Sequence, residues 1–155
     1  MKTDAALAEF KGLALLENLT IGGGRTVEKI ATFTDKALIA VAELKALKSL
    51  TIGKTPIKTT SKGFKALQKI DVLRSIEFNE CEYDDDCLKE AAAIPALTSL
   101  MLRCKGATKV TDKGLKYLES MSKAELIGIK GGPKVTQAAK DALAKALPKC
   151  KVGIG

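Results

Sequence analysis

The stretch Leu97-Thr-Ser-Leu100-Met-Leu102 is one of five copies of an apolar triplet with the spacing L-x-x-L-x-L. The other four copies begin at residues 16, 47, 73 and 124, and a weaker copy, Leu147-Pro-Lys-Cys150-Lys-Val152, closes the chain. Successive copies start 31, 26, 24, 27 and 23 residues apart. Alternating apolar residues in so short a segment indicate a β-strand with one buried face, and the regular spacing indicates a stack of similar units.

A turn and a helix signal follow the strand segments. Side chains that accept hydrogen bonds from the first turn of a helix recur at equivalent places: Thr34-Asp35, Thr60-Ser61, Asp85-Asp86, Thr111-Asp112 and Thr136-Gln137. Apolar residues at helical spacing come next, for example Phe64, Leu67 and Ile70. A strand, a helix and a return to a parallel strand form a right-handed crossover. We therefore predict an α/β fold, a right-handed solenoid with a parallel β-sheet on its concave face and helices on its convex face.

These repeats resemble the leucine-rich repeat family, whose period is roughly 20 to 29 residues. The helical outer segments are most similar to its cysteine-containing and ribonuclease-inhibitor-like classes. The resemblance covers nearly the whole chain and implies a single leucine-rich-repeat domain, residues 1–155, of about five to six repeats. Residues 3–7 already read like the middle of a repeat, which leaves open whether further N-terminal repeats precede them. Residues 22–32 exceed the template and are interpreted as an insertion on one rim.

The family pattern also implies an inward-facing side chain three residues after the last strand position, where it serves the loop backbone. Thr55 and Cys81 occupy this place, and Cys150 is interpreted as a replacement for an inward strand leucine.

The amino-acid composition indicates the general class of protein, a globular chain with an aliphatic core. The chain has 155 residues, 46% of them hydrophobic but only 4% aromatic, which suits an aliphatic core. No apolar run approaches the roughly 18 residues that a membrane helix needs, and the first ten residues carry acids where a signal peptide would be apolar. We expect a soluble protein that does not bind membranes, cytoplasmic if the chain is complete and secreted if an N-terminal signal has been removed.

The four cysteines contain no C-x-x-C pair, and the chain has no histidine. We therefore do not expect a zinc site of the usual spacing, and every catalytic scheme that uses imidazole is excluded. We predict no catalytic residue, no metal and no cofactor. The cysteines are interpreted as structural, reduced thiols, with a disulfide between Cys81 and Cys104 of neighbouring repeats as the alternative.

Two loops resemble ligand sites but have simpler explanations. The run Gly22-Gly-Gly-Arg25 lies between a strand and a helix, where backbone amides can hold phosphate, yet it lacks the Lys-Ser or Lys-Thr of a P-loop. The stretch Glu80-Cys-Glu-Tyr-Asp-Asp-Asp86 holds five carboxylates, as calcium loops do, but does not match EF-hand spacing. We interpret the first as a repeat turn and the second as helix capping.

Charge alternates along the chain. Net charges are −1 for residues 1–43, +7 for 44–74, −6 for 75–100 and +8 for 101–155, so an acidic slab lies between basic ones. We expect some opposite charges to pair between neighbouring repeats, each pair contributing about 0 to 1 kcal/mol. The acidic slab also interrupts any continuous basic track and stacking aromatics are scarce, so we do not expect nucleic-acid binding.

The outward positions of the strands indicate where a partner binds. The concave side begins with small neutral residues and becomes charged along the solenoid; the candidate partner-binding residues are Thr51, Glu77, Asn79, Met101, Arg103 and Lys130. Small residues would let a partner approach closely, although they would equally suit a tightly curved sheet. The oligomeric state cannot be read from this pattern.

The resemblance implies a non-enzymatic protein-binding module that uses its concave sheet and rim loops. The alternative is a substrate-recognition segment of a larger assembly, of F-box type or in a signalling protein, although no F-box-like helical region is present. An enzyme on this scaffold is disfavoured because the chain lacks histidine and a G-x-S-x-G motif. Fold alone does not specify the ligand.

Overall fold

The computed structural model describes residues 9–22, 32–53 and 56–155. The long elements are η1 (Glu9–Gly12), β1 (Asn18–Ile21), α2 (Asp35–Val41), β3 (Ser49–Ile52), α3 (Ser61–Leu67), β5 (Ser75–Phe78), α4 (Asp85–Ala92), β7 (Ser99–Leu102), α5 (Asp112–Leu118), β8 (Leu126–Ile129), α6 (Gln137–Ala146) and β9 (Lys151–Ile154). Three two-residue strands are β2 (Phe33–Thr34), β4 (Ile57–Lys58) and β6 (Cys81–Glu82). Within these ranges no helix is both long and apolar enough to cross a membrane.

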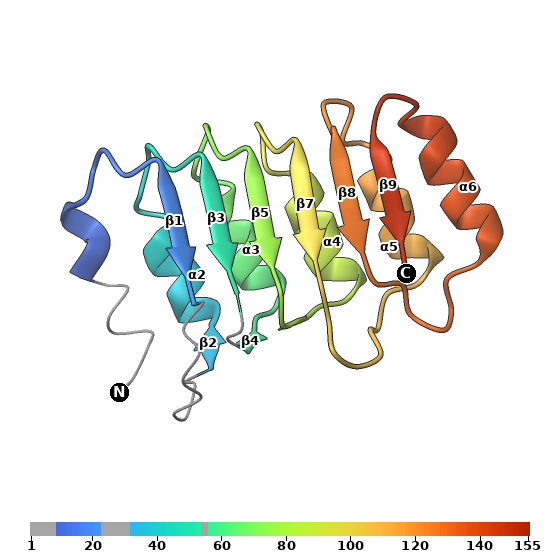
Figure 1. The fold of residues 1–155 in the computed structure, drawn as a ribbon, viewed down its shortest axis with the longest axis horizontal. Helices are drawn as coiled ribbons and strands as arrows, with labels where there is room; N and C mark the ends of the chain where they lie inside the picture. The colour runs from blue at the N-terminus through green and yellow to red at the C-terminus, as the bar shows by residue number, and fades with distance from the viewer. Residues whose placement is uncertain (1–8, 23–31, 54–55) are drawn as a thin grey trace.

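The main sheet has the strand order β1-β3-β5-β7-β8-β9, and every pair is parallel. The strands lie side by side on one face, and the helices follow one another on the opposite face (Figure 1). The first five strands lie within the five predicted triplets, and Leu100 is in register with Ile76 and Ile127. The predicted leucine-rich-repeat solenoid, with its parallel sheet and outer helices, is confirmed.

The last repeat is two residues out of step with its prediction. Val152 is in register with Ile127 and Ile154 with Ile129, so the final copy of the pattern is Lys149-x-x-Val152-x-Ile154. The prediction that Cys150 replaces an inward strand leucine was wrong, because Cys150 precedes β9 and is half-buried. Side chains alternate with a period of two, so a shift of two residues keeps the same inward and outward pattern and is hard to detect in sequence. Leu147 is instead the C-cap of α6.

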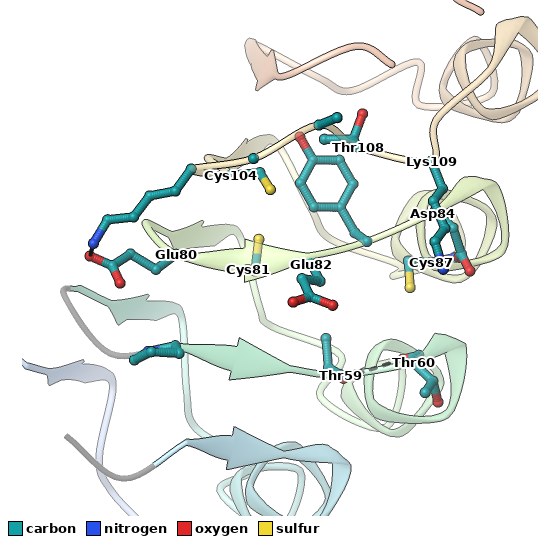
Figure 2. Close-up of a pocket in the computed structure, with 15 residues that line it drawn as sticks. Thr59, Thr60, Glu80, Cys81, Glu82, Asp84, Cys87, Cys104, Thr108 and Lys109 are labelled. Atoms are coloured by element: carbon teal, nitrogen blue, oxygen red, sulfur yellow. Dashed lines mark hydrogen bonds and ion pairs between the residues drawn. The ribbon is translucent and has the colours of Figure 1, made fainter. Parts of the chain in front are cut away.

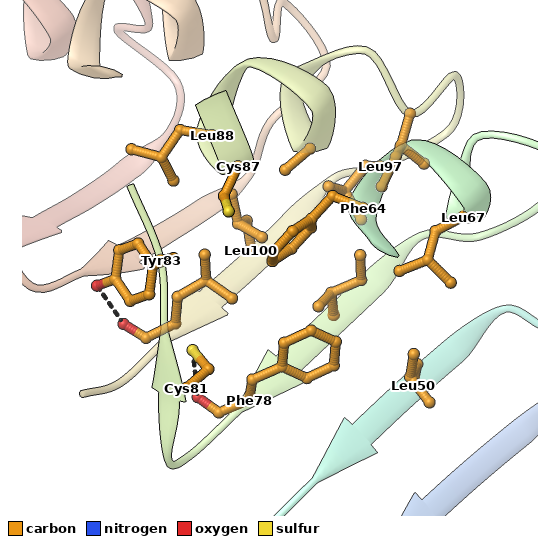
Figure 3. Packing of buried hydrophobic residues seen from close by; sticks show 14 of the residues in the cluster. Leu50, Phe64, Leu67, Phe78, Cys81, Tyr83, Cys87, Leu88, Leu97 and Leu100 are labelled. Carbon is orange, nitrogen blue, oxygen red and sulfur yellow. Dashed lines mark hydrogen bonds between the residues drawn. The ribbon is translucent and has the colours of Figure 1, made fainter. Parts of the chain in front are cut away.

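A second parallel sheet, β2-β4-β6, was not predicted. Its inward residues Phe33, Ile57 and Cys81 are in register and buried. The inward position predicted for Cys81 is confirmed, and its thiol lies 4.0 Å from the Phe78 carbonyl (Figure 3). Thr55, most of the insertion at 22–32 and residues 3–7 lie outside the described residues, so the glycine-rich loop is not described beyond Gly22.

The core fills the space between the main sheet and the helices. Aliphatic side chains from both layers are buried, and the rings of Phe64 and Phe78 pack at 5.8 Å between centroids (Figure 3). The predicted helical positions Phe64, Leu67 and Ile70 are buried in this cluster. Because each unit buries its apolar face against its neighbours, the core is continuous along the solenoid.

The helix starts agree with the predicted caps at four of five places. Thr34, Thr60, Thr111 and Thr136 each accept a hydrogen bond from a backbone N–H of the first turn. In α4 the cap is Asp84, whose carboxylate accepts from the Cys87 N–H at 2.9 Å. The acidic stretch is therefore a helix cap, as interpreted, with Asp84 as the capping residue and Asp85 and Asp86 in the first turn.

Candidate partner-binding face

The outward residues of the main sheet form rows that run across the strands. One row contains Thr51, Glu77, Met101 and Gly128 in register. Asn79, Arg103 and Lys130 lie two residues after members of this row, directly beyond the ends of β5, β7 and β8. The fold therefore places all six candidate residues on, or directly after, four adjacent strands, and we call these six residues the concave set.

Three members of the concave set contact one another. The Arg103 guanidinium donates to Asn79 Oδ1 at 3.1 Å and lies 3.6 Å from Glu77 Oε1. The Arg103 side chain remains 60% exposed and that of Glu77 36%. Neighbouring parallel strands are about 4.8 Å apart, which explains how residues 24 and 26 positions apart in the sequence meet. The group holds the guanidinium over the sheet with donors still free to bind a partner.

Met101 covers the neighbouring strand. A side chain at Gly128 would overlap the Met101 sulfur, so the Met101 side chain lies across the bare backbone of that glycine. Leu126, two residues earlier on β8, is 37% exposed. The face thus combines a charged group at β5 and β7 with an adaptable apolar contact at β7 and β8.

Hydrogen bonds to the Tyr83 hydroxyl hold the backbone of Lys130 in place. The Lys130 N–H donates to the Tyr83 hydroxyl at 2.7 Å, and that hydroxyl lies 2.9 Å from the Leu102 carbonyl and 3.1 Å from the Lys130 carbonyl. The Thr108 hydroxyl donates to the same Lys130 carbonyl at 3.0 Å. Burial raises the pKa of Tyr83, so the phenol stays protonated and able to donate. Sequence reasoning missed Tyr83, because its partners are up to 47 residues away.

A cavity of about 480 Å³ adjoins the face at the carboxyl ends of the strands. Most of its lining residues belong to the segments that follow β5 and β7, and Thr59, Thr60 and Cys87 add to the wall (Figure 2). An ion pair of 2.6 Å between the Lys105 ammonium and Glu80 joins the two segments. Asn79 and Arg103 directly precede the lining residues Glu80 and Cys104. Two members of the concave set are therefore chain neighbours of residues that line the cavity, although none of the six lines it.

Cysteine side chains line this cavity. Cys81, Cys87 and Cys104 face it; all four cysteines of the chain are free, Cys81 and Cys87 are buried, and Cys104 and Cys150 are half-buried. Burial raises the pKa of the Cys81 thiol and raises that of Cys87 to about 12, so both are protonated at neutral pH. In the described part of the chain, no group of three or more cysteines and carboxylates is arranged to hold a metal ion.

Aspartates at the helix starts join consecutive repeats. The Asp35 carboxylate accepts hydrogen bonds from the Thr60 N–H at 2.8 Å, from both the Thr59 and Thr60 hydroxyls, and from the Gly63 N–H at 3.1 Å. These donors belong to the next repeat, and they satisfy N–H groups that a helix start leaves unpaired. Each such carboxylate thus fixes the spacing between two helices.

The same contact recurs towards the C-terminus. Asp85 accepts from the Thr111 N–H at 2.8 Å and from its hydroxyl at 2.6 Å, and Asp112 does the same with Thr136 at 2.7 and 2.9 Å. The start of α3 has Ser61 instead, and the next helix is capped by Asp84. An aspartate at position 61 would face the carboxylate of Asp84, and the two negative charges would repel each other. This repulsion explains why position 61 is a serine.

Lowering the pH is expected to weaken the contact made by Asp35. Burial by itself would raise its pKa, but the hydrogen bonds from Thr59, Thr60 and Gly63 outweigh this and hold it below its ordinary value of 3.8. A carboxyl whose pKa falls on folding stabilises the protein above its unfolded-state pKa, and this contribution is lost as the pH falls through the folded-state value. We therefore expect Asp35→Asn to be less stable than wild type at pH 6, by a margin that shrinks below pH about 3.8. Urea unfolding at pH 6 and pH 3 measures both values.

The control for this experiment is Asp71→Asn, which removes one carboxylate from the exposed turn after α3. If the difference between Asp35→Asn and wild type is the same at both pH values, Asp35 does not contribute the predicted pH dependence.

The expected ion pairs between neighbouring repeats are present. Each of the three pairs found among the described residues joins two repeats, and those of Glu77 with Arg103 and Glu80 with Lys105 connect the acidic slab to the basic one after it. None of these pairs among the described residues involves Lys130, whose ammonium can therefore bind a partner's carboxylate.

Comparison with known proteins shows a similarity of shape but none of sequence. No protein-family model matches the chain, and no curated protein matches it in sequence. Among solved structures it is similar to a leucine-rich-repeat protein of Leptospira interrogans, at 13% identity and a TM-score of 0.41. The similarity covers 96% of this chain and 50% of the other, so the chain spans about half the length of that protein. The assignment of the solenoid stands on the sheet order, register and helix positions described above.

Proposed function

We propose that the chain is a non-enzymatic protein-recognition module that binds its partner across the concave set. The observation that supports this most strongly is that Arg103, Asn79 and Glu77 contact one another on the outward side of the main sheet, while the Arg103 and Glu77 side chains stay 60% and 36% exposed. Arg103 is 60% exposed although it contacts Asn79 and Glu77, so a partner gains a positioned guanidinium at little cost in side-chain entropy.

The side chains of the concave set favour a particular kind of partner. Arg103 and Lys130 favour carboxylates, while Met101 and Leu126 offer apolar contact beside them. Towards β1 and β3 the outward residues are small, with Thr20 and Thr51 in register, so a partner's backbone can approach closely there. We propose a protein segment with acidic and apolar side chains over β7 and β8. The helical outer segments support the cysteine-containing or ribonuclease-inhibitor-like class for this module.

Reversing two charges on the face should weaken binding selectively. We expect Arg103→Glu combined with Lys130→Glu to reduce affinity by at least the effect of one desolvated arginine, about 2 kcal/mol or roughly 30-fold. Partners are first captured from a source lysate on immobilised wild-type protein and identified by mass spectrometry. Each is then titrated against both proteins by calorimetry.

The matched control is Lys65→Glu combined with Lys116→Glu, which makes the same charge change on exposed residues of the helices α3 and α5. This variant should bind within a few-fold of wild type. Equal losses in the two variants, with binding in both abolished by high salt, would mean that the attraction is unspecific and that the concave set is not the binding site.

A further inference from the structure

One backbone hydrogen bond continues the pattern of the second sheet beyond its last strand, β6, and places two cysteines opposite one another. Phe33 N–H donates to the Pro56 carbonyl at 3.0 Å, and Ile57 N–H donates to the Glu80 carbonyl at 2.8 Å. In both cases the donor is in register with the residue after the acceptor, namely Ile57 and Cys81. Cys81 N–H makes the same bond to the Arg103 carbonyl at 3.1 Å. By the same rule, Cys104 is in register with Cys81.

Both side chains line the cavity. In-register residues of parallel strands lie about 4.8 Å apart and project to the same side, and disulfides form across Cα separations of about 4.4 to 6.8 Å. The Cys81 sulfur lies 3.7 Å from the Arg103 carbonyl, one residue from Cys104. Figure 2 shows both thiols among the cavity's lining residues, with the Cys81 and Cys104 sulfur atoms directed toward one another.

The geometry points to a reversible oxidation site: we propose that a peroxide converts the Cys81 and Cys104 thiols into a disulfide that ties the loop after β7 to β6. The pair is reduced in the structure, and both residues line one cavity that opens to solvent. Cys87 also lines the cavity, but it belongs to α4 and is not in register with Cys81 or Cys104. The register therefore favours a disulfide between Cys81 and Cys104 over one that includes Cys87.

The reaction begins at Cys104, which is half-buried, whereas Cys81 is 1% exposed. The Cys104 sulfur attacks one peroxide oxygen, the O–O bond breaks, and a sulfenic acid and one water form. The Cys81 sulfur then attacks the Cys104 sulfur, the S–O bond breaks, and the departing hydroxide takes the Cys81 proton to give a second water. Two thiols lose two electrons in total, and one peroxide gains them. A thiol reductant reverses the change.

The bond would alter the rim of the partner-binding face. It would hold Cys104 to β6 and draw together two walls of the cavity, directly next to Arg103. It would also close a loop of 24 residues, counted from Cys81 to Cys104, and so restrict the unfolded chain. We therefore expect a higher melting temperature for the oxidised protein, and a return to the original value after reduction.

The test uses the full chain, reduced and then freed of reductant. Folded protein is treated with a few equivalents of hydrogen peroxide, denatured, alkylated and cleaved after Glu and Asp, which separates Cys81 from Cys87. Untreated protein should give four alkylated cysteines. Treated protein should give two, with Cys81 and Cys104 in one linked peptide that dithiothreitol removes. Cys104→Ser should abolish the link, and Cys87→Ala should retain it.

Four alkylated cysteines after treatment of the folded protein would overturn the proposal. The same holds if Cys87 or Cys150 is linked as often as Cys81, or if the link forms only after urea is added. Cys81→Ala provides a further check, because Cys104 should then stop at the sulfenic acid and be captured by dimedone. Wild type and Cys104→Ser decide the matter even if Cys81→Ala does not fold.

Discussion

Leu100→Asp is expected to unfold the protein. Leu100 lies at the centre of β7, is fully buried, and is in register with Ile76 and Ile127 on both sides. A carboxylate in this position would have no hydrogen-bonding partner, and burying an unpaired charge costs several kcal/mol or more. Because the total stability of a domain is about 5 to 15 kcal/mol, this loss removes most or all of it. Circular dichroism should show little residual structure at 25 °C.

The control is Ser99→Asp, which places the same charge one residue earlier on the other face of β7. Ser99 is half-buried on the concave side, between Ser75 and Leu126. This variant should melt cooperatively within a few degrees of wild type. A Leu100→Asp protein with a melting curve like that of Ser99→Asp would contradict the assignment of the inward face.

Asp85 and Gly114 are expected to show strong coupling in a double-mutant cycle. Asp85→Ala removes two hydrogen bonds to Thr111 and should cost about 1.5 to 3 kcal/mol, because the acceptor is charged. Gly114→Ala should also destabilise the wild type, since its new methyl group would overlap the Asp85 carboxylate, which Thr111 holds in place. Once Asp85 is replaced, the same methyl group has room and brings the better helix propensity of alanine, about 1 kcal/mol.

The cycle therefore predicts a change of sign. Gly114→Ala should be destabilising when Asp85 is present and neutral or stabilising in the Asp85→Ala background. In that background Leu88 must still shift by a few tenths of an ångström, because its Cδ1 lies 3.1 Å from the new carbon. Urea unfolding of the four proteins gives the coupling energy. Gly106→Ala is the control, because nothing lies within 4 Å of its added carbon. Additive free energies would show that the aspartate does not set the space for the glycine.

The amino-acid sequence by itself determined the positions of the first five strands and the inward face of each. Leu100 and its equivalents repeat at near-constant spacing, and the period of two assigns them to the core without knowledge of the fold. The sequence also determined four helix caps, because Thr34 and its equivalents accept hydrogen bonds from backbone N–H groups only two or three residues away. These features depend on local geometry, and a local pattern is sufficient to predict them.

The tertiary structure alone decided the features that join residues far apart in the sequence. The strands of the second sheet have two residues each, too few for any periodicity to appear. Asp35 meets Thr60 across 25 positions, and Tyr83 meets Lys130 across 47. The contacts of Arg103 with Asn79 and Glu77, and the register of Cys81 with Cys104, follow from the stacking distance between repeats. That distance is set by packing across the whole core, which no single repeat encodes.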